Sequence, residues 1–237
     1  MKTKRFVVAL LIFSLVMWCG SVSALAMNTG FSTQEMTADD EQMFLSNIDL
    51  SVVKEKPEIT SMLCFDVNNN GLIAIGSRGA TKQYVSVFSS DGVFMYGYTF
   101  YCSGSFGVAW DNNNIIIYFV RSDVAALFDQ TGTNLELKKI EDTIDNNSYW
   151  NHSVFSTRRN SENCEYILQN NFGLLNVFST SYSQLVKIDP QGAKTTVVDV
   201  SQTGKTKAVV FLIITLAFIV MVALIIKRQL LKGKRFR

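Results

Sequence analysis

The chain has 237 residues, of which 48% are hydrophobic and 18% are charged, and its formal net charge at pH 7 is +2. The charges are unevenly distributed, because between Met27 and Lys207 there are 13 basic residues against 20 acidic ones, a balance of −7. Surfaces that bind nucleic acid are basic, so this acidic region argues against a nucleic-acid-binding protein.

The N-terminal segment has the three parts of a secretory signal peptide. A basic start, MKTKR, precedes an apolar run, and the small residues that follow end at Ala26. This order predicts that residues 1–26 are a signal peptide cleaved after Ala26. An uncleaved anchor is the alternative, since the apolar run is nearly long enough to span a bilayer.

Residues 27–57 are predicted to be a spacer that leads into the exported domain. Within the spacer, TADDEQMFLSNI has a threonine followed by acidic residues, which is the pattern of a capped helix start. We therefore expect a short helix there, before a domain that spans residues 58–200.

Residues 58–200 are predicted to form an all-β domain built from repeated four-strand units. Short apolar or alternating runs are separated by turns rich in Asn, Asp, Gly and Ser, which is typical of β-hairpins. The first unit contains MLCFDV, NNNG, LIAIGS, YVSVFS, SSDG and VFMYGYTF. The second contains FGVAW, DNNN, IIIYFV, VAALF, DQTG and NLELKKI, and the third contains CEYILQ, NNFG, LLNVF, SQLVKI, DPQG and TTVVDV.

The glycines that close the second turn of each unit are Gly92, Gly132 and Gly192. A period near 40 residues with four strands per unit is typical of β-propeller blades. The order strand, Asn/Gly turn, strand, VFSSDG, strand resembles NHL-type β-propeller repeats over roughly residues 62–200. The resemblance implies a binding platform and no catalytic residue.

Three propeller-like antiparallel units are fewer than the four to eight blades of a closed propeller. Three arrangements are therefore open. Further strands from the ends of the domain complete the ring, or the sheets form a partial, open stack, or two chains form a homodimer that completes one toroid.

The stretch DVNNNG, which begins at Asp66, has the residue pattern of the first six positions of a calcium-binding loop. Such a loop needs a bidentate glutamate at its twelfth position, where Ser77 stands, and flanking helices, where the sequence predicts strands. The same residues suit a tight β-turn, because Asn and Gly tolerate positive φ. We interpret Asp66 as a turn residue and predict no metal, cofactor or catalytic site.

Cysteine and histidine usage supports that prediction. Past the signal peptide the chain has Cys64, Cys102 and Cys164, which allow at most one intramolecular disulfide, and a single histidine, His152. No C-x-x-C spacing occurs, which argues against a zinc site.

A polar insertion, residues 141–163, interrupts the repeats. Insertions in repeat proteins often lie on the binding face. The predicted partner-contact residues are the aromatic and basic side chains of this segment, Tyr149, Trp150, Phe155, Arg158 and Arg159. The alternative is that the aromatic side chains pack beneath the loop as a satellite core.

The C-terminal part is predicted to anchor the protein. After a stalk at residues 201–207, residues 208–226 form a run of 19 without a charge, long enough for a transmembrane helix. Residues 227–237 carry six basic residues and no acidic one, which predicts a cytoplasmic tail.

These features predict a single-pass protein of the cell membrane that displays a binding or scaffolding domain outside the cell. The expected ligand is a protein or a glycan. One alternative is an accessory subunit of a membrane transport or secretion complex. Another is a surface hydrolase with a site assembled from Asp66, Asp111 or His152.

Overall fold

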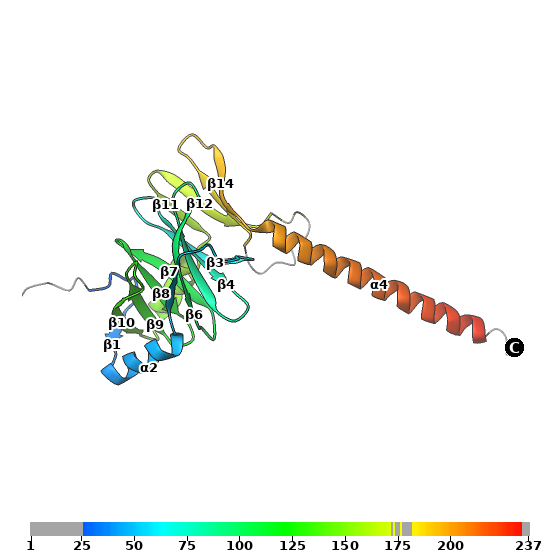
Figure 1. Ribbon diagram of the computed structural model, residues 1–237, viewed down its shortest axis with the longest axis horizontal. Helices are drawn as coiled ribbons and strands as arrows, with labels where there is room; N and C mark the ends of the chain where they lie inside the picture. The colour runs from blue at the N-terminus through cyan, green and yellow to red at the C-terminus, as the bar shows by residue number, and fades with distance from the viewer. Residues whose placement is uncertain (1–25, 172, 174–175, 177–181, 234–237) are drawn as a thin grey trace, which may run out of the picture.

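Three antiparallel sheets make up the β-rich part of the computed structural model, and one long helix projects from them (Figure 1). The structure describes residues 26–171, 173, 176 and 182–233; within the last helix, side chains at 203–204, 207–208 and 223–233 are outside the description. The predicted signal peptide therefore lies outside the described residues, apart from Ala26.

The first sheet contains the whole first unit and one added strand. Its strand order is β2-β6-β5-β4-β3, with neighbours antiparallel. The strands are β2 (Ser51–Val53), β3 (Met62–Val67), β4 (Ile73–Arg78), β5 (Gln83–Phe88) and β6 (Phe94–Phe100).

The second sheet repeats this arrangement, in the order β1-β10-β9-β8-β7. Its strands are β1 (Thr33–Glu35), β7 (Phe106–Asp111), β8 (Asn114–Phe119), β9 (Val124–Phe128) and β10 (Asn134–Ile140). The predicted four-strand antiparallel units are thus confirmed for the first two repeats. The added strands β1 and β2 come from the segment that was predicted to be a spacer.

The third sheet has four strands in chain order: β11 (Arg158–Ser161), β12 (Cys164–Gln169), β13 (Gln184–Ile188) and β14 (Lys194–Asp199). The prediction for this unit was wrong in one respect, because CEYILQ is its second strand and not its first. The missed strand β11 is polar, and its hairpin turn has no glycine: Glu162 and Asn163 take φ of 51° and 61° instead. The predicted strand LLNVF lies mostly outside the described residues.

The second turn of each unit has the same geometry, as the repeat prediction requires. In all three turns a glycine with φ near +80° donates its N–H to the carbonyl of the residue three positions earlier. The distances are 3.0 Å for Gly92 to Ser89, 2.9 Å for Gly132 to Asp129 and 2.9 Å for Gly192 to Asp189. Glycine takes this conformation without strain, which explains its recurrence.

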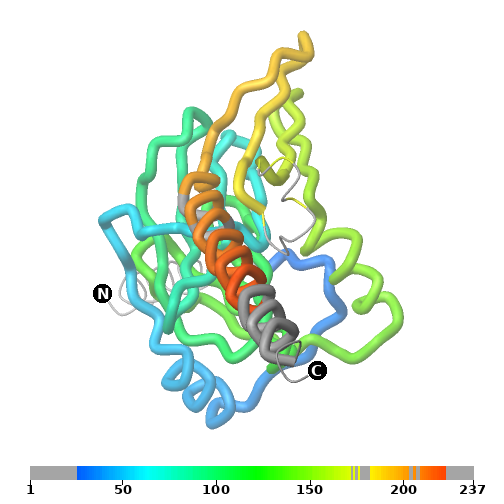
Figure 2. The backbone as a smooth tube through the Cα atoms, turned by 90° about the vertical axis from the view of Figure 1, so that its right-hand side faces the viewer, coloured from blue at the N-terminus to red at the C-terminus, as the bar shows by residue number. Residues whose placement is uncertain are grey.

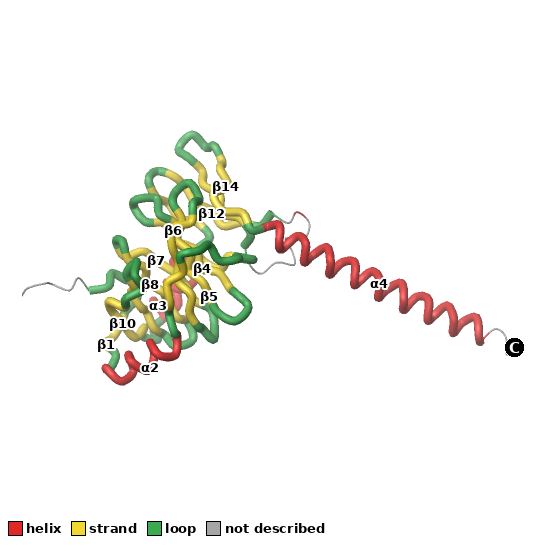
Figure 3. The backbone as a smooth tube through the Cα atoms, viewed as in Figure 1, coloured by secondary structure: helices red, strands yellow, loops and turns green. Residues whose placement is uncertain are grey.

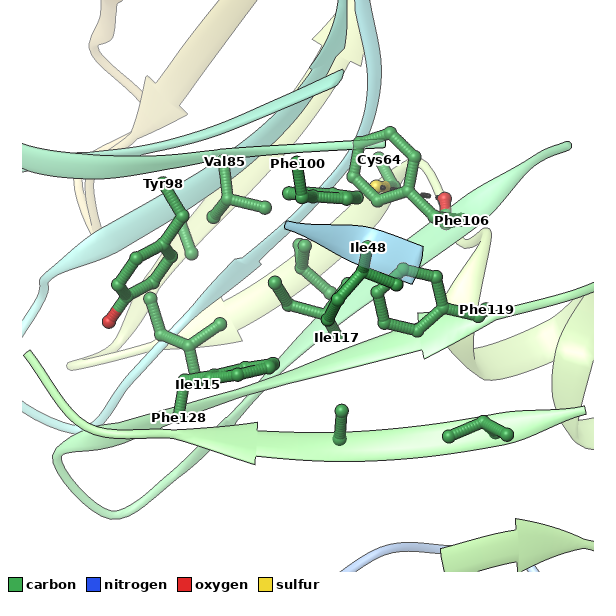
Figure 4. Close-up of a cluster of buried hydrophobic side chains, with 14 of the residues drawn as sticks. Ile48, Cys64, Val85, Tyr98, Phe100, Phe106, Ile115, Ile117, Phe119 and Phe128 are labelled. Atoms are coloured by element: carbon green, nitrogen blue, oxygen red, sulfur yellow. Dashed lines mark hydrogen bonds between the residues drawn. The ribbon is translucent and has the colours of Figure 1, made fainter. Parts of the chain in front are cut away.

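The first sheet is the middle layer of the three. Its side chains Val85, Tyr98 and Phe100 pack against Phe106 and Ile117 of the second sheet (Figure 4). Its other face, including Met62 and Phe65, packs against Tyr166, Leu168 and Leu185 of the third sheet. The last unit of the chain therefore packs on the first unit.

The insertion covers the outer face of the second sheet. It forms the helix α3 (Ile144–Tyr149) and the π-helix η1 (Trp150–Val154), and then leads into β11. In Figure 2 this segment, in yellow-green, lies beside the N-terminal segment, in blue. The buried Asn146 joins the two, because its amide accepts from Ser32 N–H and donates to Ser32 O, both at 2.9 Å.

The packing of the third sheet on the first gives a matched pair of substitutions. A Cβ at Gly92 would lie 2.3 Å from the Val197 carbonyl oxygen of β14, whereas nothing lies within 4 Å of one at Gly192. Both substitutions to alanine strain a positive φ, which costs about 1 kcal/mol. We expect Gly92→Ala to cost about 2 kcal/mol or more, since the backbone clash adds to the strain.

Urea unfolding of the full chain in detergent measures both changes in the free energy of unfolding. Equal losses for Gly92→Ala and Gly192→Ala would mean that the two sheets do not meet at this turn.

Two further helices, one beside the sheets and one projecting from them, complete the fold (Figure 3). The predicted short helix is present as α2 (Ala38–Ile48), where Thr37 Oγ1 caps the start by accepting from Asp40 N–H at 3.2 Å. The projecting helix α4 (Ser201–Gly233) follows β14 directly. Within the described part of the chain, no helix combines the length and the apolar character of a membrane span.

Candidate functional site

Asp66 lies in strand β3, which matches the predicted run MLCFDV, so its interpretation as a turn residue was wrong. Its carboxylate accepts two hydrogen bonds from distant segments: from Trp110 N–H at 2.8 Å and from Arg159 Nε at 2.9 Å. The Asp66 and Arg159 side chains are each only 18% exposed. Burial raises the pKa of Asp66, although the Trp110 amide and the Arg159 charge oppose the shift.

Arg159 extends this ion pair to the insertion. Its Nη2 donates to the carbonyls of Ser153 and Val154 at the end of η1. Its guanidinium also lies over the Phe65 ring, 5.7 Å from the centroid. Arg159 thereby joins η1 and β11 to β3, and its donors are occupied by groups of the protein itself. This arrangement holds the sheets and the insertion together.

The turn itself runs from Asn68 to Gly71, as predicted for this stretch. Asn68 Oδ1 accepts from Asn70 N–H at 2.9 Å and from Leu72 N–H at 2.8 Å, and Gly71 has φ of 73°. Asn68 Oδ1, one of the side-chain oxygens that a calcium loop would use, is therefore bonded to backbone N–H groups. Among the described residues, no three His, Cys, Asp or Glu side chains gather as a metal site.

The aromatic residues predicted to contact a partner form a half-buried cluster. The rings of Tyr149 and Trp150 each lie 4.6 Å from that of Phe31, and Phe155 stacks on Trp150 at 5.9 Å. Together they cover Tyr118 on the second sheet. The cluster corresponds to the satellite core that was the alternative reading of these aromatic residues. Their contact with a partner stays a prediction.

The two arginines of the predicted set point to different places. Arg158 is exposed and pairs with Glu165 of β12 at 2.6 Å, whereas Arg159 turns inward to Asp66. The structure therefore brings the three aromatic residues together but does not place both arginines beside them on one surface.

The residues of the hydrolase alternative have separate partners. Asp111 accepts from Asn28 N–H at 3.0 Å, and His152 Nδ1 lies 3.0 Å from the Ser148 carbonyl. Within the described residues no hydrogen bond joins either of them to Asp66. The three cysteines are free, and burial raises the pKa of the Cys64 thiol to about 12, which makes it a poor nucleophile.

A groove of about 580 Å³ lies between α2 and the ends of the first two sheets. We call it the α2 groove, and no sequence motif indicated it, because four separate segments form it. It is lined by side chains of α2, of the β4–β5 turn, of the β6–β7 link and of the β8–β9 turn: Phe44, Asn47, Ile48, Thr81, Tyr101, Cys102, Ser103, Phe119, Arg121 and Ser122.

One basic side chain, Arg121, lines the α2 groove, and its Nη1 donates to the Ser103 carbonyl at 3.2 Å. Lys82 Nζ lies 4.4 Å from the Tyr101 ring centroid and pairs with Asp49 at 2.9 Å. In the part of the chain that the structure describes, neither Arg78 nor Arg121 has a carboxylate partner within 4.0 Å.

No protein-family model matches the chain, and no curated protein matches its sequence.

Proposed function

We propose that this protein is a single-pass protein of the cell membrane that displays a binding domain outside the cell. The observation that carries the proposal is the surface of α4, where every residue from Val209 to Val222 is exposed. The projection of α4 away from the sheets (Figure 1) supports a role outside the domain core. An apolar surface of this extent is costly in water and is covered by lipid or by another chain.

Two details of α4 suit a lipid environment. Thr215, the polar residue of the exposed run from Val209 to Val222, donates its hydroxyl to the Phe211 carbonyl at 2.9 Å, so that this group is satisfied within the helix. The apolar run continues in the sequence to Ile226, and the basic residues that follow it suit the cytoplasmic side. The side chains of that continuation lie outside the described residues.

We also propose that the three sheets are blades of a propeller-like ring. In such a ring the last blade packs on the first, which supports the proposal because the third sheet packs on the first. The insertion lies between the second and third sheets in this ring. It contacts β7 of the second sheet, because a Cβ at Gly107 would lie 2.1 Å from Val154 of η1, and η1 leads into β11 of the third sheet. Asp66 and Arg159 join the inner edges of this ring.

Membrane anchoring is tested by truncation. The full chain should stay in the membrane pellet after washing with alkaline carbonate, whereas a chain that ends at Lys207 should be released. A matched control that ends at Arg228 keeps the apolar run and should stay in the pellet. Extraction of the full chain by carbonate would contradict the proposal.

A further inference from the structure

The bond that the sequence predicts to be cleaved joins an exposed residue to a buried one. Ala26 is exposed, whereas the Met27 side chain is only 7% exposed and packs with Tyr118 and Ile140 of the second sheet. Phe31 is buried in the same cluster. The residue that cleavage after Ala26 would place first in the chain is therefore held in the core by its side chain.

The backbone nitrogens of the first two residues after this bond lie against carboxylates. Met27 N–H donates to Glu136 Oε2 of β10, and Asn28 N–H donates to Asp111 Oδ2 of β7 at 3.0 Å. The Glu136 side chain is 21% exposed, and Asp111 is 8% exposed. Two acidic groups withdrawn from water suit an ammonium group at Met27 better than a neutral amide, because charge-assisted hydrogen bonds are stronger.

The basic side chains nearby leave these carboxylates only partly neutralised. Lys138 lies 3.1 Å from Glu136, but it also pairs with Glu35. Among the described residues, no Lys, Arg or His nitrogen lies within 4.0 Å of the Asp111 carboxylate. Three carboxylates thus share one lysine, and a positive charge at Met27 would improve the balance.

We propose that cleavage after Ala26 gives Met27 a free α-ammonium group that forms an ion pair with Glu136. Hydrolysis of the peptide bond by a signal peptidase consumes one water. The oxygen of that water ends in the new Ala26 carboxylate, and its two hydrogens end on the Met27 nitrogen, which is an ammonium at neutral pH. The proposal rests on the proposed display outside the cell, because signal peptides are removed from exported chains.

The ion pair has a structural consequence for the second sheet. Glu136 belongs to β10, which lies on the outer side of the unit, and Asp111 ends β7 on the other side. With Met27 bound to the first and Asn28 to the second, the new N-terminus ties β10 to β7 across the sheet. Cleavage therefore adds stability to the sheet in addition to freeing the domain from the signal peptide.

The cleaved bond is tested by N-terminal sequencing and intact mass of the full chain purified from membranes. We expect a free amine on Met27. Ala26→Leu removes the small residue that precedes the cleaved bond, so this variant should not begin at Met27. Leu25→Phe changes the unconstrained middle position of the A-x-A site and should still begin at Met27. An unsubstituted chain that begins at any other residue would overturn the proposal.

The ion pair is tested by Glu136→Gln in the cleaved chain and in the Ala26→Leu chain. The substitution should lower the melting temperature of the cleaved chain by about 2–4 °C more, because only that chain loses a bond between two charged groups. Glu35→Gln is the matched control, since it removes the other partner of Lys138 at a side chain that is 78% exposed. It should have the same small effect in both chains. Equal effects of Glu136→Gln in the two chains would overturn the ion pair.

The failure of this inference is distinguishable from that of the proposed function. If protease digests the domain on intact cells but the chain begins at Met1, the display stands and the cleavage fails. If the chain begins at Met27 but carbonate extracts it, the cleavage stands and the membrane anchor fails.

Discussion

Replacing Asp66 with asparagine should lower the free energy of unfolding by about 3 kcal/mol, which is near the lower end of the cost range for removing one partner of a buried ion pair. The substitution keeps the shape of the side chain but leaves the Arg159 charge without its partner at a site where each side chain is 18% exposed. Arg159 then loses the group that holds it between β3 and η1. Urea unfolding of the full chain in detergent measures this loss.

The double variant separates the ion pair from the general effect of substitution. Asp66→Asn combined with Arg159→Gln leaves two neutral amides, so its loss should be smaller than the sum of the two single losses by about 1 kcal/mol or more. Arg158→Gln is the neighbouring control, because it breaks an exposed pair and should change stability by about 0.5 kcal/mol or less. Additive losses in the double variant would show that Asp66 and Arg159 act independently.

The pH dependence of the Asp66 contribution has a definite sign. Burial raises the pKa of Asp66 in the folded protein, so the folded state holds this proton more tightly than the unfolded chain. The stability that comes from this tighter proton binding is therefore fully present below the ordinary aspartate pKa, and it is lost as the pH rises through the raised value. The ion pair with Arg159 belongs to the ionised carboxylate. Asp66→Asn removes the titrating group, and its stability should change less with pH across that window.

The second large effect is expected at the interface between the first two sheets. Phe106 is fully buried there, with its ring edge-on to Phe100 at 5.1 Å, and its carbonyl accepts from the Cys64 thiol at 3.5 Å (Figure 4). Phe106→Ala should cost about 3–5 kcal/mol, because it removes a buried ring and leaves a cavity. Unfolding followed by tryptophan fluorescence measures the loss.

Leu135→Ala provides the control for Phe106→Ala. Leu135 is 49% exposed on β10, so its truncation should change stability by about 0.5 kcal/mol or less. Because Phe106 joins two sheets, the Phe106→Ala variant should still unfold in one transition, at a lower denaturant concentration. Two separate transitions would show that the sheets are independent units, which the shared core contradicts.

The sequence predicts the local structure well where turn chemistry is strong. Gly92, Gly132 and Gly192 stand in equivalent turns with φ of 81°, 79° and 84°, because only glycine takes this conformation at low cost. The strands of the first two units follow from the runs between such turns. In the third unit the turn at Glu162 and Asn163 has no glycine, and β11 is polar. Neither the glycine turn nor the apolar run that marks a strand was therefore present in the sequence.

Long-range contacts could not be derived from the sequence. Asp66 looked like a turn residue because it precedes three asparagines and a glycine, yet its partner Arg159 lies 93 positions away. The packing of the third sheet on the first likewise depends on side chains far apart in the chain, such as Phe65 and Tyr166. The α2 groove was missed for the same reason, since its lining comes from four separate segments of the chain.

The most direct test of membrane display is protease treatment of intact cells that express the full chain. The chain is detected afterwards with an antibody against residues 227–237. We expect the β-domain to be digested and a short C-terminal fragment to survive, because the basic tail is proposed to lie in the cytoplasm. Protection of the whole chain in intact cells, with digestion only after lysis, would contradict the proposed display of the domain outside the cell.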